Sequence, residues 1–257
     1  MYKFTRTLVA LGCLPAVLLV GCGDNGFEAF TDSTTQDNIP INNAVISQTN
    51  FSILASDWAP TVIDPTDGSF TQTDVTLTVY TGDRNNQTIT GGNTVFFESE
   101  YGLINPPSCV TAENGTCEVT WSAIEHPGPV PNPGSDFRVT ITAYTLGEEA
   151  FTDSNGNSLF DDGDAGFEDI EEPYIDADWY RFTDGTLAAG SNIFSVGDRI
   201  IDVVSTNDPS GQNLAHDISD GFFNGAGCTH SSLCGDRTSV TIWSDIVLYI
   251  DGPPTAP

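Results

Sequence analysis

The chain has 257 residues, of which 36 are acidic and only 7 are basic, so its formal net charge at pH 7 is −29. A chain with this charge repels nucleic acid, and we expect no nucleic-acid partner. Its 39% hydrophobic and 10% aromatic residues are enough to build a core, which excludes an intrinsically disordered acidic protein.

The N-terminus has the pattern of a secretory signal peptide. Lys3 and Arg6 precede an apolar run over residues 8–20, which is shorter than the roughly 20 residues of a membrane-spanning helix. The run ends in LVGC, and this ending resembles the bacterial lipobox. The resemblance implies that residues 1–21 are a lipoprotein signal peptide and that Cys22 is lipidated. An ordinary secretory signal with an incidental Cys22 is the alternative.

A lipidated Cys22 would place the protein in the bacterial cell envelope. An anchor with more than one acyl chain holds a protein stably on a membrane, and we expect the outer membrane, with the body facing the periplasm or the cell surface. Residues 22–50 are rich in Ser, Thr, Asn, Asp and Gly. This composition predicts a flexible stalk between the lipid anchor and the folded body.

Residues 51–147 show the alternation of apolar and polar residues that is typical of β-strands. In DVTLTVY, the side chains of Val75, Leu77 and Val79 fall on one face, and the stretch FRVTITAY repeats the pattern. Turn sequences such as GDRNN and ENG separate these runs. No stretch keeps helical periodicity over three turns. The pattern therefore predicts an all-β fold, an antiparallel β-sandwich.

The order of these elements over roughly residues 50–146 resembles the bacterial immunoglobulin-like domain of the invasin/intimin type, also called Big-1-like. The matching positions are Gly92, Val95 and Phe97, then Gly102, Gly115 and a closing strand over 139–143. The resemblance implies an immunoglobulin-like sandwich that serves as a spacer or adhesive module without catalytic residues. This chain departs from the family in its added cysteine pair, its single copy and the long acidic segment that follows.

Four cysteines remain after the lipobox, and outside the cytoplasm an even set of this kind predicts disulfides. They are Cys109, Cys117, Cys228 and Cys234. Three connectivities are possible, and we favour 109–117 and 228–234 because each pair brackets a turn-rich stretch. Between the first pair, a two-residue Asn114-Gly115 turn competes with the register that sets the cysteines opposite each other, and we expect the disulfide to prevail. The alternative for the second pair is a zinc site with His230.

The segment 148–251 is acidic and ends in a strand pattern, VTIWSDIVLYI, over residues 240–250. Its first part carries too many aromatic residues for a solvated tail. We therefore expect an ordered insertion, or a small second β module, whose last strand pairs back into a sheet. Residues 252–257 are predicted to be a tail.

The stretch DSNGNSLFDDGD, over residues 153–164, has the ligand spacing of a calcium loop of EF-hand type. The predicted ligands are Asp153, Asn155, Asn157, Leu159 through its carbonyl, Asp161 and Asp164. Two departures predict weak binding, because Ser158 replaces the usual glycine at position 6 and Asp164 replaces a longer glutamate. The alternative is a solvated acidic loop held by Asx turns.

The sequence contains no G-x-S-x-G, H-E-x-x-H or P-loop motif, so we expect no enzyme. The predicted function is a membrane-anchored, calcium-stabilised surface lipoprotein in adhesion or assembly. Its partner would be another protein, a second copy of itself or a surface glycan. The alternatives are a calcium-dependent carbohydrate-binding module, for which Tyr174, Trp179 and Tyr180 would form an exposed platform, and a glycan-degrading enzyme.

Overall fold

The computed structural model describes residues 45–64, 66–67, 69–125, 138–176, 180–183, 186–189, 194–195, 198–203 and 213–250, with the backbone alone for 180–183 and 186–189. The chain divides into the units Met1–Ile39 and Pro40–Pro257, and every described residue belongs to the second. The predicted signal peptide, Cys22, most of the stalk, Trp179 and the tail lie outside the described residues.

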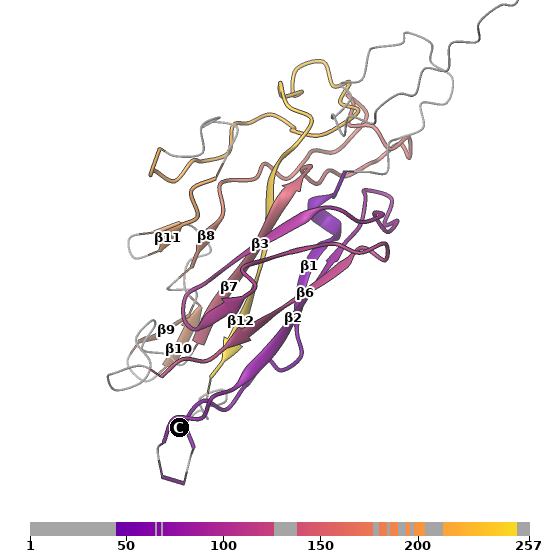
Figure 1. Cartoon of the computed structure of the whole chain (residues 1–257). Helices are drawn as coiled ribbons and strands as arrows, with labels where there is room; N and C mark the ends of the chain where they lie inside the picture. The colour runs from indigo at the N-terminus through magenta and orange to yellow at the C-terminus, as the bar shows by residue number, and fades with distance from the viewer. Residues whose placement is uncertain are drawn as a thin grey trace, which may run out of the picture. The chain divides into compact units, whose positions relative to one another are not determined.

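The described body is an all-β fold of antiparallel sheets (Figure 1), as the sequence predicts. One four-stranded sheet contains β1 (Phe51–Ala55), β2 (Asp74–Thr81), β6 (Thr116–Ser122) and β4 (Leu103–Asn105), in that order. The other contains β12 (Val240–Tyr249), β7 (Arg138–Gly147), β3 (Thr94–Ser99) and β5 (Ser108–Val110). The only helical turn in the described residues is η1 (Gln48–Asn50).

The two sheets form a sandwich because each buries the apolar side of its alternating strands. In β2, Val75, Leu77 and Val79 are completely buried, while the threonines between them are only partly covered. In β6, Trp121 is completely buried, and its indole N–H donates to the carbonyl of Tyr101 at 2.6 Å. Burying an aliphatic side chain such as Val75 or Leu77 completely stabilises the fold by about 1.5–3 kcal/mol.

The sandwich extends beyond the predicted range of 51–147 at both ends. At its C-terminal end, β12 pairs with β7 from Val240 opposite Gly147 to Tyr249 opposite Arg138. At its N-terminal end, Ile46 is 1% exposed within the core, so residues 45–50 belong to the body and not to the stalk. The pairing of β12 agrees with the expectation that the last strand returns to a sheet, whereas the burial of Ile46 has no strong local signal in the polar residues around it.

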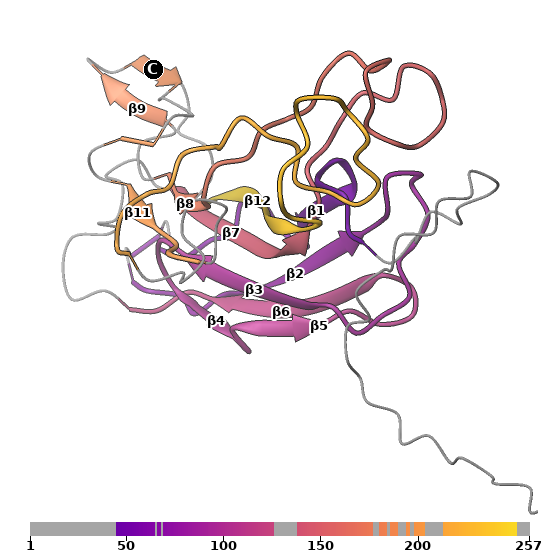
Figure 2. The same ribbon diagram turned by 90° about the horizontal axis from the view of Figure 1, so that it is seen from above.

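Residues 148–239 therefore form an insertion between two neighbouring strands of one sheet. Figure 2 shows its loops on the side of β7 and β12, away from β4 and β6. Thr140 and Thr142 of β7 donate to the carbonyls of Asp176 and Tyr174, at 2.9 and 3.3 Å. These contacts cover the outer face of β7, which explains why this strand is buried on both sides.

The insertion has little regular structure of its own. Its strand pairs are β8 (Tyr174–Ile175) with β11 (Arg199–Ile200), and β9 (Tyr180–Thr183) with β10 (Thr186–Ala189). Both pairs are antiparallel and short. Other interactions must therefore hold most of the described insertion in place.

Both predicted disulfides are present. The Cα atoms of Cys109 and Cys117 are 5.9 Å apart, and those of Cys228 and Cys234 are 5.7 Å apart. The second bond uses the sulfurs that a zinc ion would need, so the zinc alternative is wrong. The disulfide prevails over the two-residue Asn114-Gly115 turn, as expected: the N–H of Gly115 donates to the carbonyl of Ala112, so Glu113 and Asn114 form the centre of the turn. The first disulfide joins β5 of one sheet to β6 of the other.

Candidate calcium loop and the carboxylates of the insertion

The predicted calcium loop, residues 153–164, is organised around the carboxylate of Asp153. This carboxylate accepts the backbone N–H groups of Gly156 at 2.7 Å, Asn157 at 3.2 Å and Ser158 at 2.8 Å. Ser158 has φ 59°, a left-handed conformation that favours glycine. The backbone thus makes a sharp turn at position 6 of the loop even though serine occupies it.

The other predicted ligands gather around Asp161. The side-chain amides of Asn155 and Asn157 donate to its carboxylate at 3.0 and 2.7 Å. These donors, together with the N–H of Gly163, which has the largest effect, lower the pKa of Asp161. Asp164 closes the loop by accepting the N–H of Asp161 at 2.9 Å.

Leu159 follows in the same turn, and its N–H donates to the side-chain oxygen of Asn157 at 2.8 Å. The five predicted side-chain ligands therefore lie in one small, hydrogen-bonded loop. The two asparagine amides present their nitrogens to Asp161, and binding of a cation requires them to turn by 180° so that their oxygens face it.

No group of three or more His, Cys, Asp or Glu side chains that could hold a metal occurs among the described residues. Only three of the six predicted ligands belong to these types, since the others are two amides and a carbonyl. Calcium binding by this loop therefore stays a prediction.

Arg84, in the turn after β2, joins the loop to the sandwich. Its guanidinium forms a buried ion pair with Glu148, with the two side chains 8% and 2% exposed. It also donates to the carbonyls of Ser158 at 2.8 Å and Ala226 at 2.6 Å. The guanidinium of Arg84 thus connects three parts of the chain: the end of β7, the predicted calcium loop, and the segment around Ala226 that leads into the 228–234 disulfide. No pattern in the sequence predicts this role, because nothing around Arg84 indicates burial.

A small aromatic core lies beneath the loop. Phe160 and Phe223 are 1% and 0% exposed, with ring centroids 4.8 Å apart, and Phe151, Phe167 and His230 surround them. Phe160 forms a β-bridge with Cys228, and Phe223 forms one with Cys234. The insertion therefore has a hydrophobic core of its own, to which the 228–234 disulfide is attached.

Glu149 follows Glu148 directly and is 1% exposed. Its two carboxylate oxygens accept the backbone N–H groups of Ile170 at 3.0 Å and Asn224 at 2.6 Å. Burial raises the pKa of Glu149 to about 8, and the nearby negative charge of Asp169 contributes to the same shift. This carboxyl group therefore holds two distant loop segments against the end of β7.

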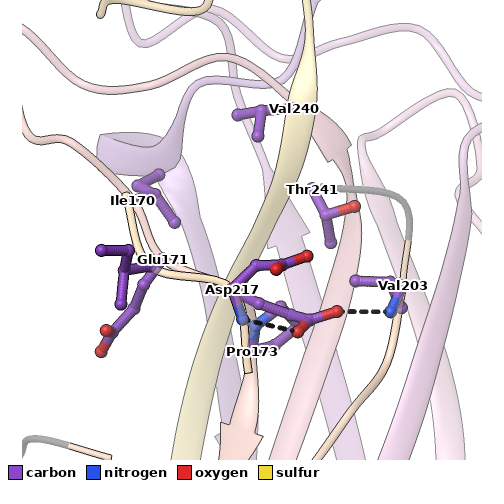
Figure 3. Close-up of a pocket in the computed structure, with 9 residues that line it drawn as sticks. Ile170, Glu171, Pro173, Val203, Asp217, Val240 and Thr241 are labelled. Atoms are coloured by element: carbon purple, nitrogen blue, oxygen red, sulfur yellow. Dashed lines mark hydrogen bonds between the residues drawn. The ribbon is translucent and has the colours of Figure 1, made fainter. Parts of the chain in front are cut away.

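Glu172 has the same function further along the insertion. It accepts the N–H groups of Val203 at 2.7 Å and Asp217 at 3.1 Å, and burial raises its pKa. Figure 3 shows these bonds beside a small cavity of about 10 Å³ next to Val240. That space has about the size of one water molecule. Many acids of the insertion thus accept loop N–H groups where sheet hydrogen bonds are lacking.

Tyr174, one of the three residues of the predicted aromatic platform, is not exposed. Tyr174 is 3% exposed, and its ring packs edge-on against Trp243, with centroids 5.5 Å apart. The side chains of Trp179 and Tyr180 lie outside the described residues. Tyr174 is therefore part of the packing between β8 and β12 and offers no exposed face for a sugar.

No protein-family model, curated protein or solved structure matches this chain. In the ranges that the structure describes, no helix has the length and apolar character needed to span a bilayer.

Proposed function

We propose that the protein is a non-catalytic module of the bacterial cell envelope, anchored by a lipid on Cys22 and acting in adhesion or assembly. The single observation that carries this proposal is the strand order of the sandwich. An immunoglobulin-type sandwich has the orders A-B-E-D and G-F-C. The sheet β1-β2-β6-β4 has the first order, and the sheet β12-β7-β3-β5 has the second with β5 added at its edge. The resemblance to the invasin/intimin-type domain agrees with this correspondence.

The position of the insertion supports a role in recognition. It replaces the connection between the last two strands, β7 and β12, and in immunoglobulin variable domains that connection is one of the antigen-binding loops. Long connections in compact domains are commonly functional. The partner that we propose is another protein, a second copy of the chain or a surface glycan.

Calcium in the loop 153–164 is the proposed stabiliser of this insertion. The ligand types and spacing fit calcium, and the left-handed turn at Ser158 matches the position where such loops need glycine. Arg84 contacts the loop at the carbonyl of Ser158, but its charge is already paired with Glu148. A bound cation would relieve the repulsion among the loop carboxylates, with a Kd of about 10⁻⁴ to 10⁻³ M.

Thermal melting of the full chain in 10 mM calcium and in excess chelator tests the metal site. We expect calcium to raise the melting temperature by about 3–8 °C, because binding to the folded state alone stabilises it by mass action. Asp153→Ala should abolish this rise. Asp67→Ala, which removes a comparable exposed contact to Ser69, should keep it. Equal melting temperatures with calcium and chelator would exclude the metal.

Membrane fractionation tests the anchor. We expect the wild-type chain in a bacterial host to remain with the outer membrane after a high-salt wash, because acyl chains and not charge hold it there. Cys22→Ser should release the chain into the soluble fraction. Retention of Cys22→Ser on the membrane would contradict lipidation at this residue.

A further inference from the structure

Two segments of the insertion, residues 220–224 and 234–237, enclose a surface hollow of about 480 Å³. This volume falls within the range of about 300–1,000 Å³ of sites for small ligands. The residues that the hollow presents are Asp220, Phe222, Asn224, Gly235, Asp236 and Arg237. None of them belongs to the predicted calcium loop.

The frame of the hollow is held rigidly. The N–H of Phe223 donates to Leu233 at 2.8 Å, and the N–H of Gly235 donates to Phe223 at 2.9 Å. The disulfide of Cys234 continues this frame. A Cβ on Gly235 would lie 2.4 Å from the side-chain oxygen of Asn224, so no larger residue fits there. The hollow is therefore preformed.

Three side chains at the hollow, those of Phe222, Asp236 and Arg237, are available to contact a ligand. The Phe222 ring is 44% exposed and, within the described part of the chain, packs against no other ring. In the same residues, Asp236 and Arg237 form no hydrogen bond or ion pair, whereas Arg84 and Arg199 each pair with a glutamate. An unpaired arginine in so acidic a chain leaves five N–H donors available to a ligand.

The floor of the hollow adds a further polar group. Asn224 is 1% exposed, and its side-chain oxygen is buried beneath Gly235 without a hydrogen-bond donor. Its amide nitrogen donates to the carbonyl of Phe222 at 2.9 Å. Donors and acceptors thus lie together around one exposed aromatic ring.

We propose that this hollow binds a neutral sugar unit of a glycan. The net charge of −29 repels anionic ligands, and the hollow itself combines the donor Arg237 with the acceptors Asp220 and Asp236. Sugar hydroxyls both donate and accept, so they match Arg237 and Asp236 together. The Phe222 ring provides an apolar surface for the C–H face of the sugar. This inference rests on the proposed adhesive function for its setting and names the class of its partner.

The test is binding of the purified full chain, in detergent, to an array of neutral oligosaccharides of glucose, galactose, mannose and N-acetylglucosamine. Sialylated and sulfated oligosaccharides are included for comparison. We expect binding to neutral glycans alone. Phe222→Ala and Arg237→Gln should each weaken it about tenfold or more, as expected for the loss of a ring contact or a charged donor. Leu214→Ala, at an 84% exposed position of the same insertion, is the matched control and should bind normally.

Absence of binding, binding to acidic glycans alone, or neutral binding that both variants retain would overturn the proposal. Folding of each variant is checked by its melting temperature. The result is separable from the calcium experiment. A chain that binds neutral glycans but melts alike with calcium and chelator loses only the metal site, and a chain with the opposite behaviour loses only the sugar site.

Discussion

Replacing Arg84 with methionine should lower the free energy of unfolding by about 3–5 kcal/mol. The guanidinium and the carboxylate of Glu148 are almost fully buried, and removing one partner leaves the other as an uncompensated buried charge. The carbonyls of Ser158 and Ala226 also lose their donor. Urea denaturation followed by tryptophan fluorescence measures the loss, and hydrogen exchange should show it first in the insertion.

Two comparisons separate this effect from a general loss of charge. Arg199→Met breaks the exposed pair with Glu98, whose side chains are 50% and 40% exposed, and should cost at most about 1 kcal/mol. The double variant Arg84→Met, Glu148→Met should be more stable than Arg84→Met alone, because no charge is then left buried. Equal losses for Arg84→Met and Arg199→Met would show that Arg84 does not join the insertion to the sandwich.

The second large effect is a loss of stability with rising pH that Glu149→Gln removes. The pKa of Glu149 is about 8 in the folded chain, against an ordinary value of 4.5. Between these values the folded chain holds a proton that the unfolded chain has lost. Its stabilising contribution is therefore complete below about pH 4.5 and disappears as the pH rises through 8. The change amounts to a few kcal/mol as an order of magnitude.

Melting temperatures measured from pH 5 to pH 9 test this linkage. The wild-type chain should lose several degrees over that range. Glu149→Gln removes the titrating group but also one of the two acceptors, because an amide NH2 cannot accept the N–H of Ile170 or Asn224. Its melting temperature should therefore be lower than that of the wild type at pH 5 but should change less between pH 5 and pH 9. Glu118→Gln, at an exposed position of β6, should follow the wild-type curve. Parallel curves for Glu149→Gln and the wild type would refute the linkage.

The sequence by itself determined the features that depend on near neighbours. The alternation in β2 and β7 predicts strands because successive side chains of a strand point to opposite faces. The two disulfides join cysteines only 8 and 6 residues apart, so the nearest pairing was also the correct one. The loop at 153–164 is compact and hydrogen-bonded around Asp153 and Asp161, and calcium binding there stays a prediction.

Only the tertiary structure decided which distant residues meet. Arg84 reaches Glu148 across 64 residues and Ala226 across 142, and no local pattern selects such partners. In the sequence, Glu149 and Glu172 look like two more acids in an acidic run. They became buried backbone acceptors because separate loops close over them, and burial, which sets the pKa of a carboxyl group, is a property of the whole packing and not of the residue. The hollow beside Phe222 and Arg237 arises in the same way, from two segments that only the disulfide-linked fold brings together.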